Sequence, residues 1–581
     1  MNVVVKLSSK YENLEKRCGC CCTNTGNNIT NTTPSTITID NDNDNNSLDE
    51  LALVLLNTTN NEPKTYKQAI ESLNKEEWLN AMNTEITELE AQNTWTITNL
   101  PPNKTTLRGK WVYKLKTDNK GNIKKYKARW VIKGFNQILG IDYIDTFSTT
   151  CRPETYRLVF IIAITNNWKL NQYDVKNAFV HALIDVEIYT ELPTGYYTNT
   201  PNKVCKLNKA LYGLKQSPRL WYKHLYNILN KLGFTIFPYD EAVFIHIEYK
   251  IIIICHVDDF ITTGPNNTQI QLIIKEVNKE IKLQYLGELN QFLGMDFTIN
   301  NNKELYINQH KYTQDIINKY NKQDLIPIST PINLGVQLIK SNTQANKEDI
   351  KLYQQQIGAL LYLALKTRPD ITYAVNKCSR FMSNPDKSHF KALDQIWKYL
   401  NKYPKLGLYY NCNNPTNTLK GYSDSDWGGD ISSRKSTSGF LFLYNNNIIS
   451  WNSTLQKTVA LSSCEAEYMA LKEATKESIY LTSVITYINT KLHLYNTSNT
   501  PTILVDNKGS LKLAENPEFH KRTKHIDIIY HFIRECIRDN KLKVGYIPTL
   551  EQLADGFTKG LDNNKQQNLI NNLNINKNMT L

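Results

Sequence analysis

The pattern of apolar and polar positions divides the chain into five parts. Residues 23–62 are dominated by Asn, Thr and Asp and cannot bury enough apolar surface to offset the entropy of ordering, so a disordered, Asn-rich leader is predicted over residues 1–63. Residues 69–89 carry apolar side chains every three or four positions, which predicts one helix. Amphipathic helices, 353–365 and 389–403 among them, follow between 323 and 417. Short strands return from residue 418, and the Asn-rich segment 561–581 is predicted to be disordered again.

Residues 109–133 alternate in a way that predicts two strands joined by a turn at 119–122. This hairpin is crowded with Lys and Arg. One interpretation is a solvated sheet edge on which lysines prevent pairing with another chain. The other is a basic finger that lies over phosphates.

Composition and charge narrow the classes of partner. With 581 residues, the chain has room for two to four domains. The formal charge of +13 attracts nucleic acid, but it attracts anionic membrane surfaces equally well. No apolar run is long enough for a transmembrane helix. The apolar run within the first ten residues is too short for the core of a signal peptide. The Cys cluster at 18–22 has no His nearby, so zinc binding is disfavoured and a reducing, intracellular compartment fits best.

The first carboxylate set lies upstream of residue 260. Asp258 and Asp259 stand between two apolar strands, where adjacent acids repel each other unless a cation neutralises them, although an ordinary turn is the alternative. Asp174 ends an apolar strand that follows a helix. Phosphoryl transfer to a nucleotide needs two Mg²⁺ ions about 3.5–4 Å apart, held by such carboxylates. In the run 211–221, Gly213 permits close backbone approach and Lys215 and Arg219 suit phosphates, unless the run is only a turn that starts a helix.

The second set of acids begins near residue 421. Asp424 ends a strand, and Glu467 follows Ser463 at the capped start of a long helix. Asp506 ends another strand, and Asp555 lies on a closing helix. Each acid alone is typical of a solvated surface. Four acids spread over about 130 residues cannot form a local salt-bridge cluster.

These blocks together resemble the reverse transcriptase of copia-type retrotransposons, followed by an RNase H domain. The resemblance runs in order from about residue 64 to 560, and it implies an α+β multidomain protein. The expected parts are right-hand polymerase fingers and palm (64–322), a helical thumb or connection (323–417) and an RNase H-like α/β domain (418–560). The matching blocks are WLNAM (78–82), KWV (110–112), YKAR (126–129), QYDV (172–175), LYGLKQSPRLW (211–221), VDD (257–259), FLGMDF (292–297), RPD (368–370), SRFM (379–382), SRKSTSG (433–439) and RTKHID (522–527).

The resemblance implies roles for individual residues. The metal-binding catalytic acids would be Asp174, Asp258 and Asp259 in the polymerase, and Asp424, Glu467, Asp506 and Asp555 in the RNase H domain. The substrate-binding residues would be Lys116, Lys127 and Arg129 for the triphosphate, Phe179 as the gate against ribose, and Gly213, Lys215, Gln216 and His256. Leu293 and Gly294 look like a primer grip.

Two departures from the family stand out. His256 replaces the usual aromatic residue, most often Tyr, two positions before the acid pair. The RNase H loop 547–552 lacks the His that many such enzymes carry, and His525 and His531 are interpreted as helix-surface residues. Asp426 and Glu465 adjoin the acids without an assigned role.

The expected function is RNA-directed DNA synthesis with hydrolysis of the RNA strand of the hybrid, using Mg²⁺ or alternatively Mn²⁺. Expected partners are an RNA template, a DNA or tRNA primer, the RNA–DNA hybrid and deoxynucleoside triphosphates, with the element's capsid and integrase as further candidates and no membrane. Family members work in cytoplasmic virus-like particles, and the nucleus is the alternative location. The chain is expected to be the C-terminal part of a polyprotein. A catalytically inactive relic that only binds nucleic acid is the second hypothesis, which the presence of all seven acids opposes.

Overall fold

Two helices, α2 (Tyr66–Ile70) and α3 (Lys75–Ala91), stand where the periodicity predicted one helix over 69–89. The single helix is wrong because the apolar stripe is interrupted: the Leu73 side chain is completely exposed between them. From Trp78 onward the stripe resumes, with Met82 and Leu89 buried on the same face.

This computed structural model describes residues 62–117, 123–196, 202–300, 302–495, 500–515 and 527–575. The predicted leader up to residue 61, the Cys cluster, the turn at 119–122 and His525 lie outside these ranges. No helix within them is long and apolar enough to cross a membrane.

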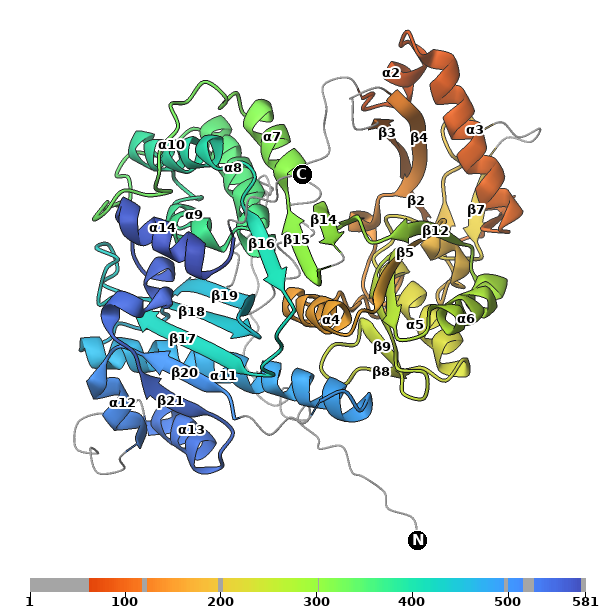
Figure 1. The fold of residues 1–581 in the computed structure, drawn as a ribbon. Helices are drawn as coiled ribbons and strands as arrows, with labels where there is room; N and C mark the ends of the chain where they lie inside the picture. Colours follow the sequence, from red (N-terminus) through yellow and green to blue (C-terminus); the bar gives the residue numbers. More distant parts are fainter. Residues whose placement is uncertain are drawn as a thin grey trace, which may run out of the picture. The chain divides into compact units, whose positions relative to one another are not determined.

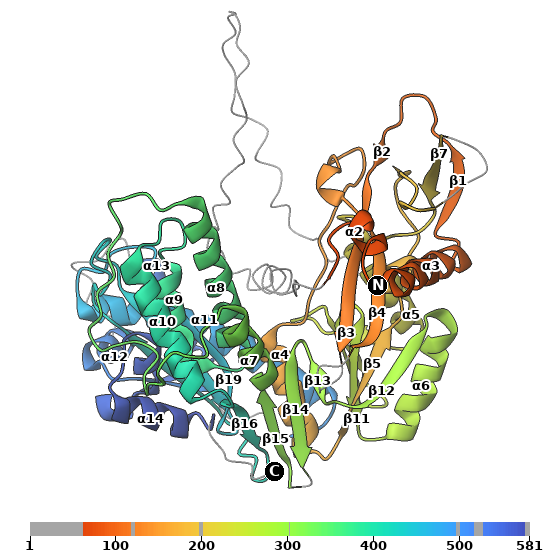
Figure 2. The ribbon, with the colours of Figure 1, turned by 90° about the horizontal axis from the view of Figure 1, so that it is seen from above.

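The basic hairpin forms as predicted from β3 (Gly109–Thr117) and β4 (Ile123–Ile132), and α3 packs against it (Figure 2). Cross-strand pairs alternate between its two faces. Trp111 opposite Trp130 and Tyr113 opposite Ala128 are buried, and Trp78 of α3 contacts Tyr113 with ring centroids 5.1 Å apart. The other face carries the cations Lys110, Lys114, Lys116, Lys125, Lys127 and Arg129. A second small sheet has the order β1-β7-β6-β2, with β1 (Trp95–Asn99), β7 (Lys203–Leu207), β6 (Tyr189–Thr190) and β2 (Thr106–Leu107).

A six-stranded sheet carries the first acids, in the order β12-β5-β11-β10-β9-β8. Its strands and covering helices are β5 (Lys169–Val175), β8 (Thr235–Ile236), β9 (Val243–His246), β10 (Ile251–His256), β11 (Asp259–Gly264), β12 (Leu283–Glu288), α4 (Pro153–Thr165), α5 (Ser217–Lys231) and α6 (Asn267–Glu280). Ile252 and Ile254 join the core that contains α4, whereas Ile251 and Ile253 join the core that contains α5 and α6. Both faces of the sheet are therefore covered, which is why β10 reads as a continuous apolar run.

The middle region combines helices with a four-stranded sheet. Its elements are β13 (Gln291–Phe292), β14 (Met295–Asn300), β15 (Glu304–Asn308), α7 (His310–Lys319), α8 (Lys347–Lys366), α9 (Thr372–Ser379), α10 (Lys387–Lys402) and β16 (Gly407–Asn411). β16 returns from the end of the helical run to pair with β15. Arg368 and Asp370 form a fully buried ion pair, with Nη2 and Oδ2 2.7 Å apart, and the Tyr399 hydroxyl donates to the same carboxylate oxygen at 2.8 Å. The RPD block (368–370) therefore connects the segment after α8 to α10 through buried polar contacts.

The last region has a five-stranded sheet in the order β19-β18-β17-β20-β21 (Figure 1). Its elements are β17 (Leu419–Ser425), β18 (Thr437–Tyr444), β19 (Asn447–Leu455), α11 (Ser463–Lys491), β20 (Thr502–Val505), α12 (Lys508–Glu515), α13 (Asp527–Arg538), β21 (Lys543–Tyr546) and the 3-10 helix η6 (Leu553–Phe557). β17 runs antiparallel to β18 but parallel to β20. The mixed α+β architecture is thus as predicted. Ser462, one residue earlier than expected, caps α11 by accepting the Glu465 amide.

The disordered tail predicted for 561–581 is wrong for its first part. Helix α14 (Asn563–Asn572) forms there, capped by the Asp562 side chain. Leu569, Ile570 and Leu573 recur at helical spacing and are buried, so a few apolar residues suffice to dock this Asn-rich segment. Residues 576–581 lie outside the described ranges.

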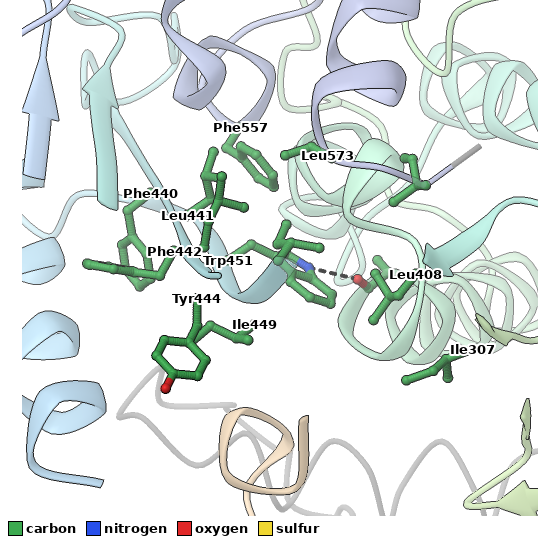
Figure 3. Close-up of a cluster of buried hydrophobic side chains, with 14 of the residues drawn as sticks. Ile307, Leu408, Phe440, Leu441, Phe442, Tyr444, Ile449, Trp451, Phe557 and Leu573 are labelled. Carbon is green, nitrogen blue, oxygen red and sulfur yellow. Dashed lines mark hydrogen bonds between the residues drawn. The ribbon is translucent and has the colours of Figure 1, made fainter. Parts of the chain in front are cut away.

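Arg157 of α4 joins three regions at one buried point. Its guanidinium donates to Ile449 O of β19 at 3.0 Å and to Leu365 O and Lys366 O at the end of α8 at 2.6 and 2.9 Å. It also lies 4.0 Å from the ring centroid of Trp451, whose indole N–H donates to Ala364 O at 3.0 Å. Figure 3 shows Trp451 and Ile449 in one apolar cluster with Leu408 of β16.

Candidate active sites

The first site centres on two acids that face each other across paired strands. In the register of β5 and β11, Asp174 lies directly opposite Asp259. Asp174 is the last residue but one of β5 and Asp259 is the first residue of β11, so the pairing of these strands brings the two acids together at one end of the sheet. Asp258 sits in the two-residue turn that joins β10 to β11, and its backbone carbonyl accepts the Val175 amide at 2.8 Å.

The turn that carries Asp258 is held in an uncommon conformation. Val257 has a φ of 55°, which is rare for a β-branched residue and indicates a position fixed by its surroundings. Its carbonyl accepts the Trp221 indole N–H at 2.8 Å. The LYGLKQSPRLW block therefore supports the acid turn directly, through its last residue.

The electrostatics of this site favour a cation. Burial, followed by the Asp258 and Asp174 carboxylates, raises the pKa of Asp259 to about 7. Burial also raises the pKa of Asp258, against the lowering effect of Arg129. A bound divalent ion would relieve this arrangement, because burial first and the neighbouring carboxylates second disfavour the charged form of these acids.

The cationic face of the hairpin acts on these acids. The charges of Arg129 and Lys127 oppose the rise in the pKa of Asp258, and the charge of Lys116 opposes the rise in the pKa of Asp259. The Arg129 guanidinium lies 4.8 Å from the ring centroid of Tyr212. Tyr212 in turn contacts Phe179 edge-to-face, with ring centroids 4.8 Å apart. Lys116, Lys127 and Arg129 thus act on the acid pair, and Arg129 is linked to the predicted gate Phe179 through Tyr212.

Gly213 packs the block against the hairpin at a point where only glycine fits. Its φ is +92°, and a Cβ there would lie 2.0 Å from the Ile132 carbonyl oxygen. Lys215 donates to Gln137 O at 3.3 Å and lies 4.8 Å from the Tyr143 ring centroid.

Gln216 occupies a different environment from the one expected of a substrate ligand. Its side chain is fully buried, donates to Asp142 O at 2.8 Å and accepts from Gln137 at 3.0 Å. It therefore holds the loop 134–145, and direct substrate contact by Gln216 stays only a prediction. Arg219 pairs with Asp145 at 2.9 Å.

His256 lies beside the acids as a neutral ring. Burial, followed by the charge of Lys366, lowers its pKa to about 4. Its Nδ1 is buried and has no hydrogen-bond partner in the described part of the chain. The ring contacts Phe292 edge-to-face at 6.3 Å. The next residue, Leu293, has a φ of 48°, and its carbonyl accepts the Tyr362 hydroxyl, so the predicted primer grip is held by α8.

The second site gathers acids from distant parts of the sequence. Carboxylate oxygens of Asp424, Asp506 and Asp555 all lie within 4.8 Å of one another. Within the described ranges no other set of three His, Cys or acidic side chains approaches so closely. β17 and β20 run parallel, so the acids at their carboxyl ends meet at one sheet edge, and η6 brings Asp555 to them.

Glu467 completes the second site from the first turns of α11. Burial, followed by Asp424 and Asp506, raises its pKa to about 10. Its Oε2 is buried and has no hydrogen-bond partner among the described residues. Burial and Asp555 raise the pKa of Asp424 as well. Such a set of crowded, buried carboxylates fits a hard divalent cation.

Sequence reasoning missed two residues near these sites. Lys559 forms an ion pair with Asp555, Nζ to Oδ1, at 2.8 Å. Glu85 of α3 is buried, and burial raises its pKa to about 7 although Arg129 and Lys127 oppose the shift. Its position on the stripe of Trp78, Met82 and Leu89 was the available signal, because a charge there has to be buried.

Asp426, Glu465 and His531, which have no catalytic role assigned from the sequence, lie outside the acid cluster of the second site. Asp426 accepts the Thr437 amide, and Glu465 accepts the Leu461 amide at 2.9 Å, so both hold loops near the second site. His531 is exposed on α13, in agreement with its interpretation as a surface residue.

Comparison with known proteins gives one family match and several long relatives. The family described as reverse transcriptase (RNA-dependent DNA polymerase) matches residues 92–334. The retrovirus-related Pol polyprotein from transposon RE1 of Arabidopsis thaliana is 36% identical over 519 residues, which cover 88% of this chain and 34% of the polyprotein. The corresponding polyprotein from transposon TNT 1-94 of Nicotiana tabacum is 36% identical over 87% of this chain and 38% of its own length. The chain thus spans about a third of these relatives.

Among solved structures, a foamy viral protease-reverse transcriptase in complex with double-stranded DNA is 12% identical, with a TM-score of 0.41 over 81% of this chain and 69% of that one. We base no statement about fold or function on a similarity this low.

Proposed function

Because this chain belongs to the copia-type retrotransposon family of reverse transcriptases, we propose that it is an RNA-directed DNA polymerase that also hydrolyses the RNA strand of RNA–DNA hybrids. The observation that carries the polymerase half is the pairing of Asp174 with Asp259 beneath the cationic face of the β3–β4 hairpin. We propose no activity that belongs to the two thirds of the relatives' length that this chain does not span.

The residues present fit divalent metal ions at both sites. Asp174, Asp258 and Asp259 would hold them in the polymerase, and Asp424, Glu467, Asp506 and Asp555 in the RNase H-like region. The raised pKa values of Asp259 and Glu467 and the Glu467 oxygen that lacks a partner among the described residues support this, because burial disfavours the charged form of these two acids unless a cation neutralises it. Mg²⁺, with Mn²⁺ as the alternative, would stabilise charge on the phosphate oxygens and activate the attacking oxygen when bound.

The chain's own cations would receive the incoming deoxynucleoside triphosphate. Lys116, Lys127 and Arg129 share one face of the hairpin and act on the acids, so a triphosphate between them would contact both. Phe179, braced by Tyr212, would pack against the sugar and exclude a 2′-hydroxyl. His256 would meet the primer terminus as a neutral ring, since its pKa lies far below physiological pH.

The substrates of this activity would be an RNA template, a DNA or tRNA primer and the RNA–DNA hybrid. The excess of 68 Lys and Arg over 55 Asp and Glu supports polyanionic partners. By family resemblance we place the activity in cytoplasmic virus-like particles, with the element's capsid and integrase as neighbours.

One experiment with two variants tests both halves. A labelled primer is extended on a labelled RNA template by the wild type, Asp258→Asn and Asp424→Asn. We expect Asp258→Asn to abolish extension but still cut a preformed hybrid, and Asp424→Asn to do the reverse. If the wild type makes no more DNA than Asp258→Asn, the polymerase half fails, and if it also cuts no more RNA than Asp424→Asn, the chain is an inactive relic. If it cuts no more RNA than Asp424→Asn, only the RNase H half fails.

A further inference from the structure

We propose that an apolar shelf beside the second acid cluster, formed by Trp427, Val459 and Leu461, seats the RNA–DNA hybrid next to the phosphodiester that is cut. This inference rests on the proposed RNase H activity. It assigns a positioning role to side chains that lie outside the acid cluster.

The shelf consists of large apolar side chains that face solvent. Trp427 is 61% exposed, Val459 46% and Leu461 72%. They come from two loops, one after β17 and one between β19 and α11, and the Trp427 indole N–H joins the loops by donating to Ala460 O at 3.2 Å. An aromatic ring with its polar edge already bonded and its faces exposed is typical of a contact surface.

Hydrogen bonds hold the loop between β19 and α11 in place. The side-chain amide of Gln456 donates to Ser438 Oγ and to Ala466 O, both at 2.9 Å. Ser462 caps α11, and the Leu461 amide donates to Glu465 at 2.9 Å. The exposed apolar groups are therefore fixed on a rigid support, which reduces the entropy lost when a ligand binds.

The shelf continues the acid cluster along the same sheet edge. Trp427 follows Asp424 by three residues at the carboxyl end of β17, and Leu461 immediately precedes the cap of the helix that carries Glu467. A duplex whose phosphate reached Asp424, Asp506 and Asp555 would therefore place its neighbouring nucleotides toward this shelf.

Charge and shape both favour a hybrid duplex as the occupant. Arg434 lies next to the shelf, with its Nη2 3.7 Å from the position that a Cβ would take on Gly428, and Lys457 is exposed on the second loop. These cations suit phosphates. An RNA-containing duplex has a wide, shallow minor groove that displays 2′-hydroxyls and base edges, and its width leaves room for an exposed indole and a leucine side chain to contact the sugars.

Steady-state cleavage of a short fluorescent RNA–DNA hybrid by the full chain tests the shelf. We expect Trp427→Ala to raise KM about tenfold with kcat within about twofold, since loss of one ring contact to a nucleotide has this size. Leu461→Ala should act in the same direction, and Trp427→Phe should restore most of the affinity. Leu73→Ala is the matched control for Leu461→Ala, because Leu73 is an exposed leucine far along the chain from the shelf, and it should leave KM unchanged. Primer extension by Trp427→Ala should equal that of the wild type.

A wild-type KM for Trp427→Ala, or a loss of kcat alone, overturns the shelf while the RNase H activity stands. Cleavage by the wild type no faster than by Asp424→Asn overturns the RNase H proposal and the shelf with it. As a second readout, hybrid binding by fluorescence anisotropy in the Asp506→Asn background should weaken to the same extent on adding Trp427→Ala, and unchanged binding contradicts the proposal.

Discussion

Replacing Arg157 by Met should destabilise the fold more than any surface substitution. The guanidinium is about 1% exposed and satisfies three carbonyl oxygens, two of them in the last turn of α8, where helix carbonyls lack partners. Hydrogen bonds from a charged donor contribute about 1.5–3 kcal/mol each, and burying the charge offsets part of the sum. Removing the donor also takes this buried partner away from all three carbonyls. We therefore expect a loss of about 3–5 kcal/mol.

Equilibrium urea unfolding, followed by far-ultraviolet circular dichroism and Trp fluorescence, measures this loss. Arg538→Met is the matched control, because that side chain is 75% exposed and pairs with the exposed Asp539, so its effect should stay within about 0.5 kcal/mol. Arg157→Lys should fall between the two, since one ammonium reaches fewer of the carbonyls. If Arg157→Met unfolds at the same urea concentration as the control, the buried junction does not stabilise the protein as argued.

Three further predictions concern the polymerase region. Burial raises the pKa of Glu85 to about 7, so the folded state keeps a proton that the unfolded state loses above about pH 4.5. Wild-type stability should therefore fall between pH 4 and pH 8 relative to Glu85→Gln, by roughly 2–3 kcal/mol in urea unfolding; an equal gap at both pH values refutes the assignment. Gly213→Ala should cost about 1–3 kcal/mol more than Gly140→Ala, because both glycines have positive φ but only a Cβ at Gly213 meets the Ile132 carbonyl; equal losses contradict the clash. Phe179→Ala should raise ribonucleotide incorporation about tenfold or more in single-nucleotide extension, and unchanged selectivity excludes the gate.

Local patterns were sufficient for the parts of the fold that depend on near neighbours. Alternation predicted the β3–β4 hairpin, and the two apolar runs around Asp258 predicted the strand-turn-strand that carries it. The failures were also local in origin. A single exposed Leu73 splits the first helix, and three apolar residues in α14 outweigh an Asn-rich composition.

Contacts between residues far apart in the sequence could not be predicted from local patterns. Nothing near Arg157 indicates that it bonds to Ile449, 292 positions away. Asp424, Asp506 and Asp555 were identified as a group only through family resemblance, because their proximity depends on β17 and β20 lying parallel in one sheet. Gln216 shows the converse: its place in a family motif suggested substrate contact, and the structure buries it in a loop.

The most direct test of the account is RNA-templated primer extension with Mg²⁺ by the wild type and Asp258→Asn under identical conditions. Neutralising one acid of the pair while keeping its shape should reduce the extension rate at least about 100-fold, since it removes a charge that would hold the metal ions. Comparable extension by the two proteins, or none by either, would contradict the claim that Asp174, Asp258 and Asp259 form a working polymerase site.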